Sequence, residues 1–228
     1  MGGLGQVIAA AASFVGTHFL LSHPLRAPLV RQVGEGVFAA IYSLVAALTL
    51  WWLVVAYRAA PPTEMLWPVG DVLWAVVTVV MLVAAILLMG SLVRNPALPG
   101  PTDAALPEAR GVYAITRHPM LWSFALWGIC HIAVYPQPAN IAVAGAMVVL
   151  SLVGAALQDR KKVELQPQRW PAWQARTSFW PFAAIAVGRA RFGDFGGHAL
   201  GGGAVVWLAA TWAHIPLSGW PAGIWRWL

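Results

Sequence analysis

The chain has 228 residues, of which 60% are hydrophobic and only 10% are charged, and fourteen of them are tryptophans. Soluble domains carry roughly 25% charged residues, so this composition argues against a water-soluble globule and equally against a disordered chain. The net charge of +6 comes from only fourteen Lys and Arg side chains, which form no compact basic tract, so we expect no nucleic-acid partner. A single cysteine, Cys130, excludes an intramolecular disulfide and every cysteine-cluster metal site.

Successive apolar runs predict an all-α protein, a polytopic bundle of about six transmembrane helices. A helix that crosses the hydrocarbon layer needs about twenty mostly apolar residues. Runs of this kind lie at residues 4–22, 36–57, 68–92, 119–136, 139–157 and 199–216. The last is the weakest, because Gly201, Gly202 and Gly203 open it. No internal repeat is visible, so we expect one integral-membrane domain over residues 1–228.

The basic residues predict the orientation, because Lys and Arg gather on the cytoplasmic side of a membrane protein. If the N-terminus lies outside, twelve of the fourteen cations fall in inner segments: Arg26, Arg31, Arg94, Arg110, Arg117, Arg160, Lys161, Lys162, Arg169, Arg176, Arg189 and Arg191. Only Arg58 and Arg226 lie on the outer side. We therefore expect a multi-pass protein of a bacterial inner membrane with both termini in the periplasm.

Two inner segments are too long to be tight turns. Prolines interrupt residues 93–118 and predict a loop or short helical pieces: Pro96, Pro99, Pro101 and Pro107. In residues 158–198 the cations alternate with aromatic side chains: Trp170, Trp173, Phe179 and Trp180. That pattern is typical of an amphipathic segment on the cytoplasmic leaflet.

Three histidines, His18, His131 and His214, lie within predicted spans. A charged side chain costs roughly 2.5–3.5 kcal/mol in hydrocarbon, so we expect an ionisable residue there to have a structural or functional role. Neutral imidazole is a good iron ligand, and two such rings facing each other can hold a haem by both axial positions. Alternatively, each histidine only bonds a neighbouring carbonyl. Spacing alone leaves both interpretations open.

A second candidate site lies at the start of the fourth span. Pro119 fits the first helical position, and a helix N-terminus beside Arg117 and His118 is suited to an anion. The alternative is a helix start that anchors the chain at the interface. His118 and His131 lie about 140° apart around one helix, so we expect them to serve different sites.

Residues 113–119, the pair Cys130-His131 and the stretch 177–189 together resemble the NnrU family. In the last of these, Thr-Ser-Phe-Trp-Pro-Phe-Ala-Ala-Ile is followed by Gly188-Arg189. The resemblance extends from about His18 to His214. It implies a link to denitrification, around nitrite and nitric oxide reduction.

The NnrU family also looks related to the plant 15-cis-zeta-carotene isomerases, and that resemblance implies a cofactor. In those enzymes a b-type haem lies between a histidine of the first helix and the histidine thirteen residues beyond Arg-His-Pro, which correspond here to His18 and His131. It also implies redox-gated cis–trans isomerisation of a hydrophobic substrate. Helix geometry places His18 and His131 about 12 Å apart in depth, whereas His214 lies near the depth of His131. His214 therefore stays open as the second ligand.

Two further interpretations stay open. The Arg-His-Pro motif also resembles membrane methyltransferases for isoprenylcysteine and phospholipids, where it helps to hold S-adenosylmethionine; the matching residues are Arg117, His118, Pro119 and Glu164. In the haem interpretation, Arg117 and His118 instead form a cytoplasmic-side pocket for a haem propionate or another anion. A non-catalytic membrane protein that senses or delivers haem or nitric oxide for a partner reductase is the third class.

Overall fold

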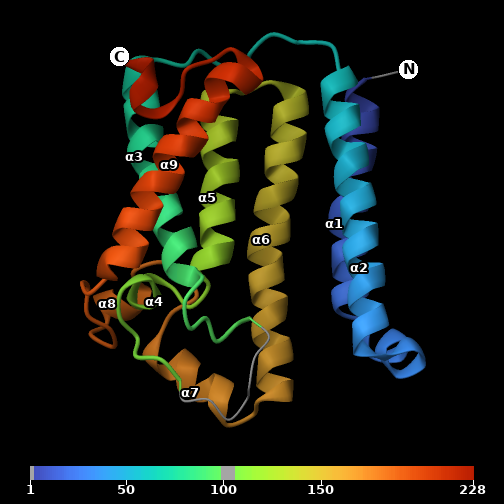
Figure 1. The fold of residues 1–228 in the computed structure, drawn as a ribbon, viewed down its shortest axis with the longest axis vertical. Helices are drawn as coiled ribbons and strands as arrows, with labels where there is room; N and C mark the ends of the chain where they lie inside the picture. Colours follow the sequence, from blue (N-terminus) through green and yellow to red (C-terminus); the bar gives the residue numbers. More distant parts are fainter. Residues whose placement is uncertain (1–2, 99–105) are drawn as a thin grey trace.

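The computed structural model describes residues 3–98 and 106–228, which form helices and loops without a β-strand (Figure 1). In chain order the elements are α1 (Leu4–Ser22), α2 (Arg26–Ala59), α3 (Asp71–Ser91), α4 (Val112–Ile115), α5 (Pro119–Val134), α6 (Pro138–Leu165), α7 (Arg169–Arg176), α8 (Ala183–Ala186), α9 (Gly196–Ser218) and the 3₁₀ helix η1 (Gly223–Arg226). Helices α1, α2, α3, α6 and α9 are long and apolar enough to cross a membrane, and α5 is a shorter apolar helix. The predicted polytopic all-α bundle is confirmed.

The long helices alternate in direction, so that α1 begins and α9 ends at the same end of the bundle (Figure 1). We call this the terminal end, and we call the opposite end, which carries α4, α7 and α8, the basic end. Helix α6 packs against α5 and α1, α5 packs against α3, and α3 packs against α9. The hairpin of α1 and α2 therefore joins the other helices mainly through α6. Of the proline-rich segment 93–118, residues 99–105, with Pro99 and Pro101, lie outside the described residues.

Large apolar side chains cover the outside of the bundle. Leu44, Val72 and Val205 are exposed, on three different helices. In water an apolar surface of this extent would drive aggregation, whereas in a bilayer lipid tails cover it. The structure therefore fits a lipid environment for the apolar helices.

Helix α2 is bent near its start. Gly34 has φ +81°, which interrupts the helical backbone and separates residues 26–33 from the apolar part. Before the bend, Arg26 pairs with Glu35 at 3.3 Å and lies over the ring of Phe38. The predicted span from residue 36 thus starts just beyond the bend.

Glycines allow the closest helix contacts. A Cβ on Gly203 of α9 would lie 2.8 Å from the Cα of Ile86 on α3, and one on Gly128 of α5 would lie 2.6 Å from the carbonyl oxygen of Ala144 on α6. Small residues permit such approach in membrane bundles, where packing drives helix association. Within the glycine-rich start of α9, which weakens its apolar signal, Gly203 thus packs directly against α3.

We predict that Gly203→Ala lowers the stability of the detergent-solubilised protein by about 1–3 kcal/mol, because the new methyl group must push the backbone of α3 away. Gly201→Ala is the matched control, since a Cβ there meets nothing within 4 Å. Unfolding of both variants in the same detergent gives the comparison. Equal stability of the two variants would contradict the close packing of α3 and α9.

Candidate functional site

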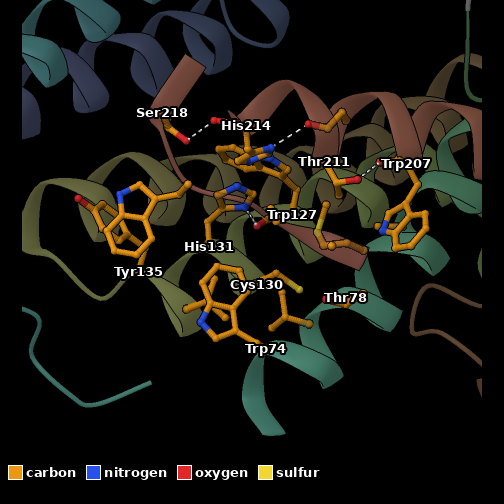
Figure 2. A pocket seen from close by; sticks show the side chains of 18 of the residues that line it. Trp74, Thr78, Trp127, Cys130, His131, Tyr135, Trp207, Thr211, His214 and Ser218 are labelled. Carbon is orange, nitrogen blue, oxygen red and sulfur yellow. Dashed lines mark hydrogen bonds between the residues drawn. The ribbon is translucent and has the colours of Figure 1, made fainter. Parts of the chain in front are cut away.

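A cavity of about 640 Å³, seen from close by in Figure 2, lies in the bundle and reaches the terminal end, where Ser218 and Gly223 line it. Helices α3, α5 and α9 and the 3₁₀ helix η1 supply most of its walls. The lining is mainly apolar and aromatic, with Trp74, Trp127 and Trp207 among its members. Its volume falls within the range of roughly 300–1,000 Å³ that is usual for cofactor and ligand pockets.

Two histidines lie next to each other in this cavity, His131 on α5 and His214 on α9 (Figure 2). Their ring centroids are 6.0 Å apart and their planes differ by 30°. The Nδ1 atoms lie 2.7 Å from the carbonyl oxygen of Trp127 and 2.8 Å from that of Ala210, respectively. Because a carbonyl can only accept, each Nδ1 carries the proton, and each Nε2 keeps its lone pair for another partner.

The two rings do not form a metal site by themselves. Residues 3–98 and 106–228 contain no group of three or more His, Cys, Asp and Glu residues placed to hold a metal ion. A structural zinc ion takes four protein ligands, which this cavity does not offer. Two imidazoles suit a haem, whose iron needs only axial ligands from the protein.

The spacing of His131 and His214 fits that arrangement. Two metal–imidazole bonds of about 2 Å each account for roughly 4 Å of the separation between two rings that share one metal. The distance from each coordinating nitrogen to its ring centre accounts for the remainder of the observed 6.0 Å. In the structure the two rings are stacked, so ligation of one iron by both would require the two Nε2 atoms to turn toward a common point.

Further contacts hold both histidines in place. Asn140 of α6 donates hydrogen bonds to the carbonyl oxygens of His131 and Tyr135, at 2.9 Å and 2.6 Å, and so ties the end of α5 to α6. The ring of Trp127 lies 4.1 Å from that of His131. On α9 the hydroxyl of Ser218 donates to the carbonyl of His214 at 2.7 Å. The cavity therefore presents both imidazoles from packed helices.

His18 lies elsewhere. Its Nδ1 donates to the carbonyl of Phe14 at 2.7 Å, and its ring contacts Phe14 and Tyr42 between α1 and α2. It is not among the described residues that line the cavity of His131. The structure thus brings His131 together with His214, and it does not bring His131 together with His18.

Arg117 and His118 both bind the carboxylate of Asp159, at the basic end. Arg117 donates from Nε and Nη2, His118 Nε2 lies 2.9 Å from Oδ1, and Trp170 Nε1 donates to the same oxygen at 3.0 Å. The side chains of Arg117 and Asp159 are 11% and 12% exposed, and that of His118 is fully buried. These contacts make a largely buried ionic cluster.

The stretch 177–185 packs onto this cluster. The amide of Arg117 donates to the carbonyl of Ser178, the hydroxyl of Thr116 donates to that of Phe179, and the amide of Phe182 donates to that of Ile115, each at 2.8 Å. Two of the three segments that carry the family resemblance, residues 113–119 and 177–189, are therefore hydrogen-bonded to each other. Their polar groups act in the fold of the basic end.

Asp159 is a residue that the sequence prediction does not include among its sites. Its signal is a carboxylate two residues beyond the predicted apolar span 139–157, where a basic partner is favourable. Glu164, the carboxylate that the methyltransferase resemblance implies, is exposed and has no described contact with Arg117 or His118. This arrangement favours a structural role for the Arg-His-Pro motif.

Comparison with known proteins gives one match. A family model described as NnrU protein matches residues 6–222. This range contains both histidines of the cavity and all members of the ionic cluster. No curated protein and no solved structure matches the chain.

We predict that Asp159→Ala destabilises the protein by about 3–5 kcal/mol, because it leaves the charge of Arg117 buried without its partner. Glu164→Gln removes an exposed carboxylate of the same helix and should leave stability unchanged. Denaturant unfolding in detergent measures both effects. If Asp159→Ala unfolds like the Glu164→Gln control, the cluster does not hold the basic end together.

Proposed function

The chain belongs to the NnrU family, and we propose that it is a membrane haem protein that binds one b-type haem through His131 and His214. The pair of imidazoles 6.0 Å apart, each with Nδ1 bound within its own helix, carries this proposal. Bound between them, the haem would supply a redox-active iron. We take His214 and not His18 as the second ligand, because the ring of His18 contacts Phe14 and Tyr42 between α1 and α2 and not His131.

The chain's own residues would bind and tune the group. The backbone carbonyls of Trp127 and Ala210 accept the Nδ1 protons of the two ligands, which orients the rings and leaves each Nε2 as the nitrogen that would bind iron. The apolar walls suit the macrocycle.

The role we propose is electron transfer or sensing in nitrite and nitric oxide reduction, on behalf of a partner reductase. Family membership supports the link to denitrification. Ligation by two histidines supports electron transfer or sensing, because activation of a small ligand requires one axial position to open.

A second candidate function is redox-gated cis–trans isomerisation of a hydrophobic small molecule. The mainly apolar lining of the cavity favours this candidate, since a polyene would need such walls. In this case reduction would have to release one histidine from the iron.

We place the protein in a bacterial inner membrane with both termini in the periplasm. The bundle supports this placement, because α1 begins and α9 ends at one end while the predicted inner segments with α4, α7 and α8 lie at the other (Figure 1). Basic residues favour the cytoplasmic side.

The haem proposal predicts a low-spin Soret band in protein purified from haem-replete cells, with sharpened visible bands after reduction by dithionite. His131→Ala and His214→Ala should lose the low-spin signature, whereas His18→Ala, the matched control, should keep it. A colourless wild-type preparation would contradict haem binding. Loss of the signature in His18→Ala with retention in His214→Ala would contradict the ligand pair.

Two assays separate the functional alternatives. We expect no heat of binding on titration of the folded protein with S-adenosylmethionine, because Arg117 and His118 are both bound to Asp159; measurable binding would favour the methyltransferase interpretation.

Incubation of the reduced, haem-loaded protein with a cis polyene tests the isomerase candidate. Turnover would assign the protein to that class, and its absence supports electron transfer or sensing.

A further inference from the structure

Arg226 is a cation at the end of the bundle where cations are scarce. Of the fourteen Lys and Arg residues, only Arg58 and Arg226 fall on the side opposite the basic segments. A positive charge on that side departs from the usual distribution of Lys and Arg in membrane proteins, so we expect a local interaction to stabilise it. Arg58 is exposed, whereas Arg226 lines the cavity that contains His131 and His214.

The 3₁₀ helix η1 brings Arg226 to the cavity. Gly223, with φ +60°, lies so close to α9 that a Cβ would be 2.7 Å from Cγ2 of Thr211. Beside it, Trp225 Nε1 donates to the hydroxyl of Thr211 at 3.1 Å. The end of the chain is therefore folded back onto α9, and Arg226 takes its place beside α3 and α9.

The guanidinium of Arg226 lies against aromatic rings and does not use all of its hydrogen-bond donors. It lies 4.8 Å from the ring centre of Trp74 and 5.6 Å from that of Trp227. Its Nη2 donates to Asp71 at 3.1 Å, but the Asp71 side chain is 76% exposed against 26% for Arg226. The Nε atom is buried without a hydrogen-bond partner among the described residues.

Arg226 is also the one formally charged side chain among the described residues of the cavity wall, if the histidines are neutral. A guanidinium binds a carboxylate through two parallel hydrogen bonds, and this pairing strengthens where water is excluded. Asp71, on the solvent side, supplies only one such bond. The cavity therefore offers a cationic donor to a ligand that has an apolar body and an acidic group.

We propose that Arg226 binds a carboxylate of the cavity ligand and, with haem as that ligand, a propionate. This inference rests on the proposed function. A bond from Arg226 to a propionate would orient the cofactor: the macrocycle would lie between His131 and His214, with that propionate turned toward η1 at the terminal end. Arg117 and His118, which the sequence suggests for a propionate, are instead bound to Asp159 at the basic end.

The test compares haem with haem dimethyl ester, whose propionates are neutral. Protein from haem-deficient cells is titrated in detergent with each porphyrin, as wild type, Arg226→Gln, Arg226→Lys and Arg58→Gln. Wild type and the Arg58→Gln control should bind haem roughly ten- to a hundredfold more tightly than the ester. Arg226→Gln should lose this preference, and Arg226→Lys, which keeps the charge, should retain part of it.

The midpoint potential gives a second measurement. Removing a positive charge near the iron stabilises the ferric state, so Arg226→Gln should have a lower midpoint potential than wild type, with Arg58→Gln unchanged. If Arg226→Gln binds haem and still prefers it to the ester as wild type does, the inference is overturned while the haem proposal stands. If wild type binds neither porphyrin, the proposed function itself fails.

Discussion

The ion pair of Asp159 with Arg117 is the constraint that fixes how α5, α6 and α7 meet at the basic end. The carboxylate of Asp159 accepts hydrogen bonds from Arg117, His118 and Trp170, and so joins the start of α5, the end of α6 and α7 at one point. A buried guanidinium without such a partner is strongly unfavourable. Because α5 runs from this cluster to His131, the anchor at the basic end also sets where the imidazole stands in the cavity.

The polar residues at the two ends of the bundle therefore have different roles. At the basic end, Arg117, His118 and Trp170 bind Asp159 and hold the fold, while Nδ1 of His118 and Nε1 of Trp173 are buried without a hydrogen-bond partner among the described residues. At the terminal end, His131 and His214 each keep one ring nitrogen without a described partner, and Arg226 keeps unused donors. Polar atoms in an apolar cavity that lack partners within the protein are suited to a ligand. The cofactor is therefore placed between α5 and α9, where His131, His214 and Arg226 line one cavity.

The spans were predictable from sequence because each is a long apolar run, and an α-helix satisfies all backbone hydrogen bonds within such a run in lipid. The partners of the polar residues were less predictable. Depth along the helices left His214 open as a rival to His18, but which helices are neighbours depends on close contacts such as Gly203 against Ile86. Likewise, the carboxylate that binds Arg117 lies 42 residues further along the chain, on another helix. Local sequence around the Arg-His-Pro motif therefore predicts an anion site without revealing that the protein itself supplies the anion.

Electron paramagnetic resonance of the oxidised, haem-loaded protein tests the central claim most directly, because the spectrum reports the axial ligands of the iron. The account predicts a low-spin ferric signal of two-imidazole ligation in the wild type, replaced by a high-spin signal in His214→Ala. A high-spin wild type, or a low-spin signal unchanged in His214→Ala, would contradict ligation by His131 and His214.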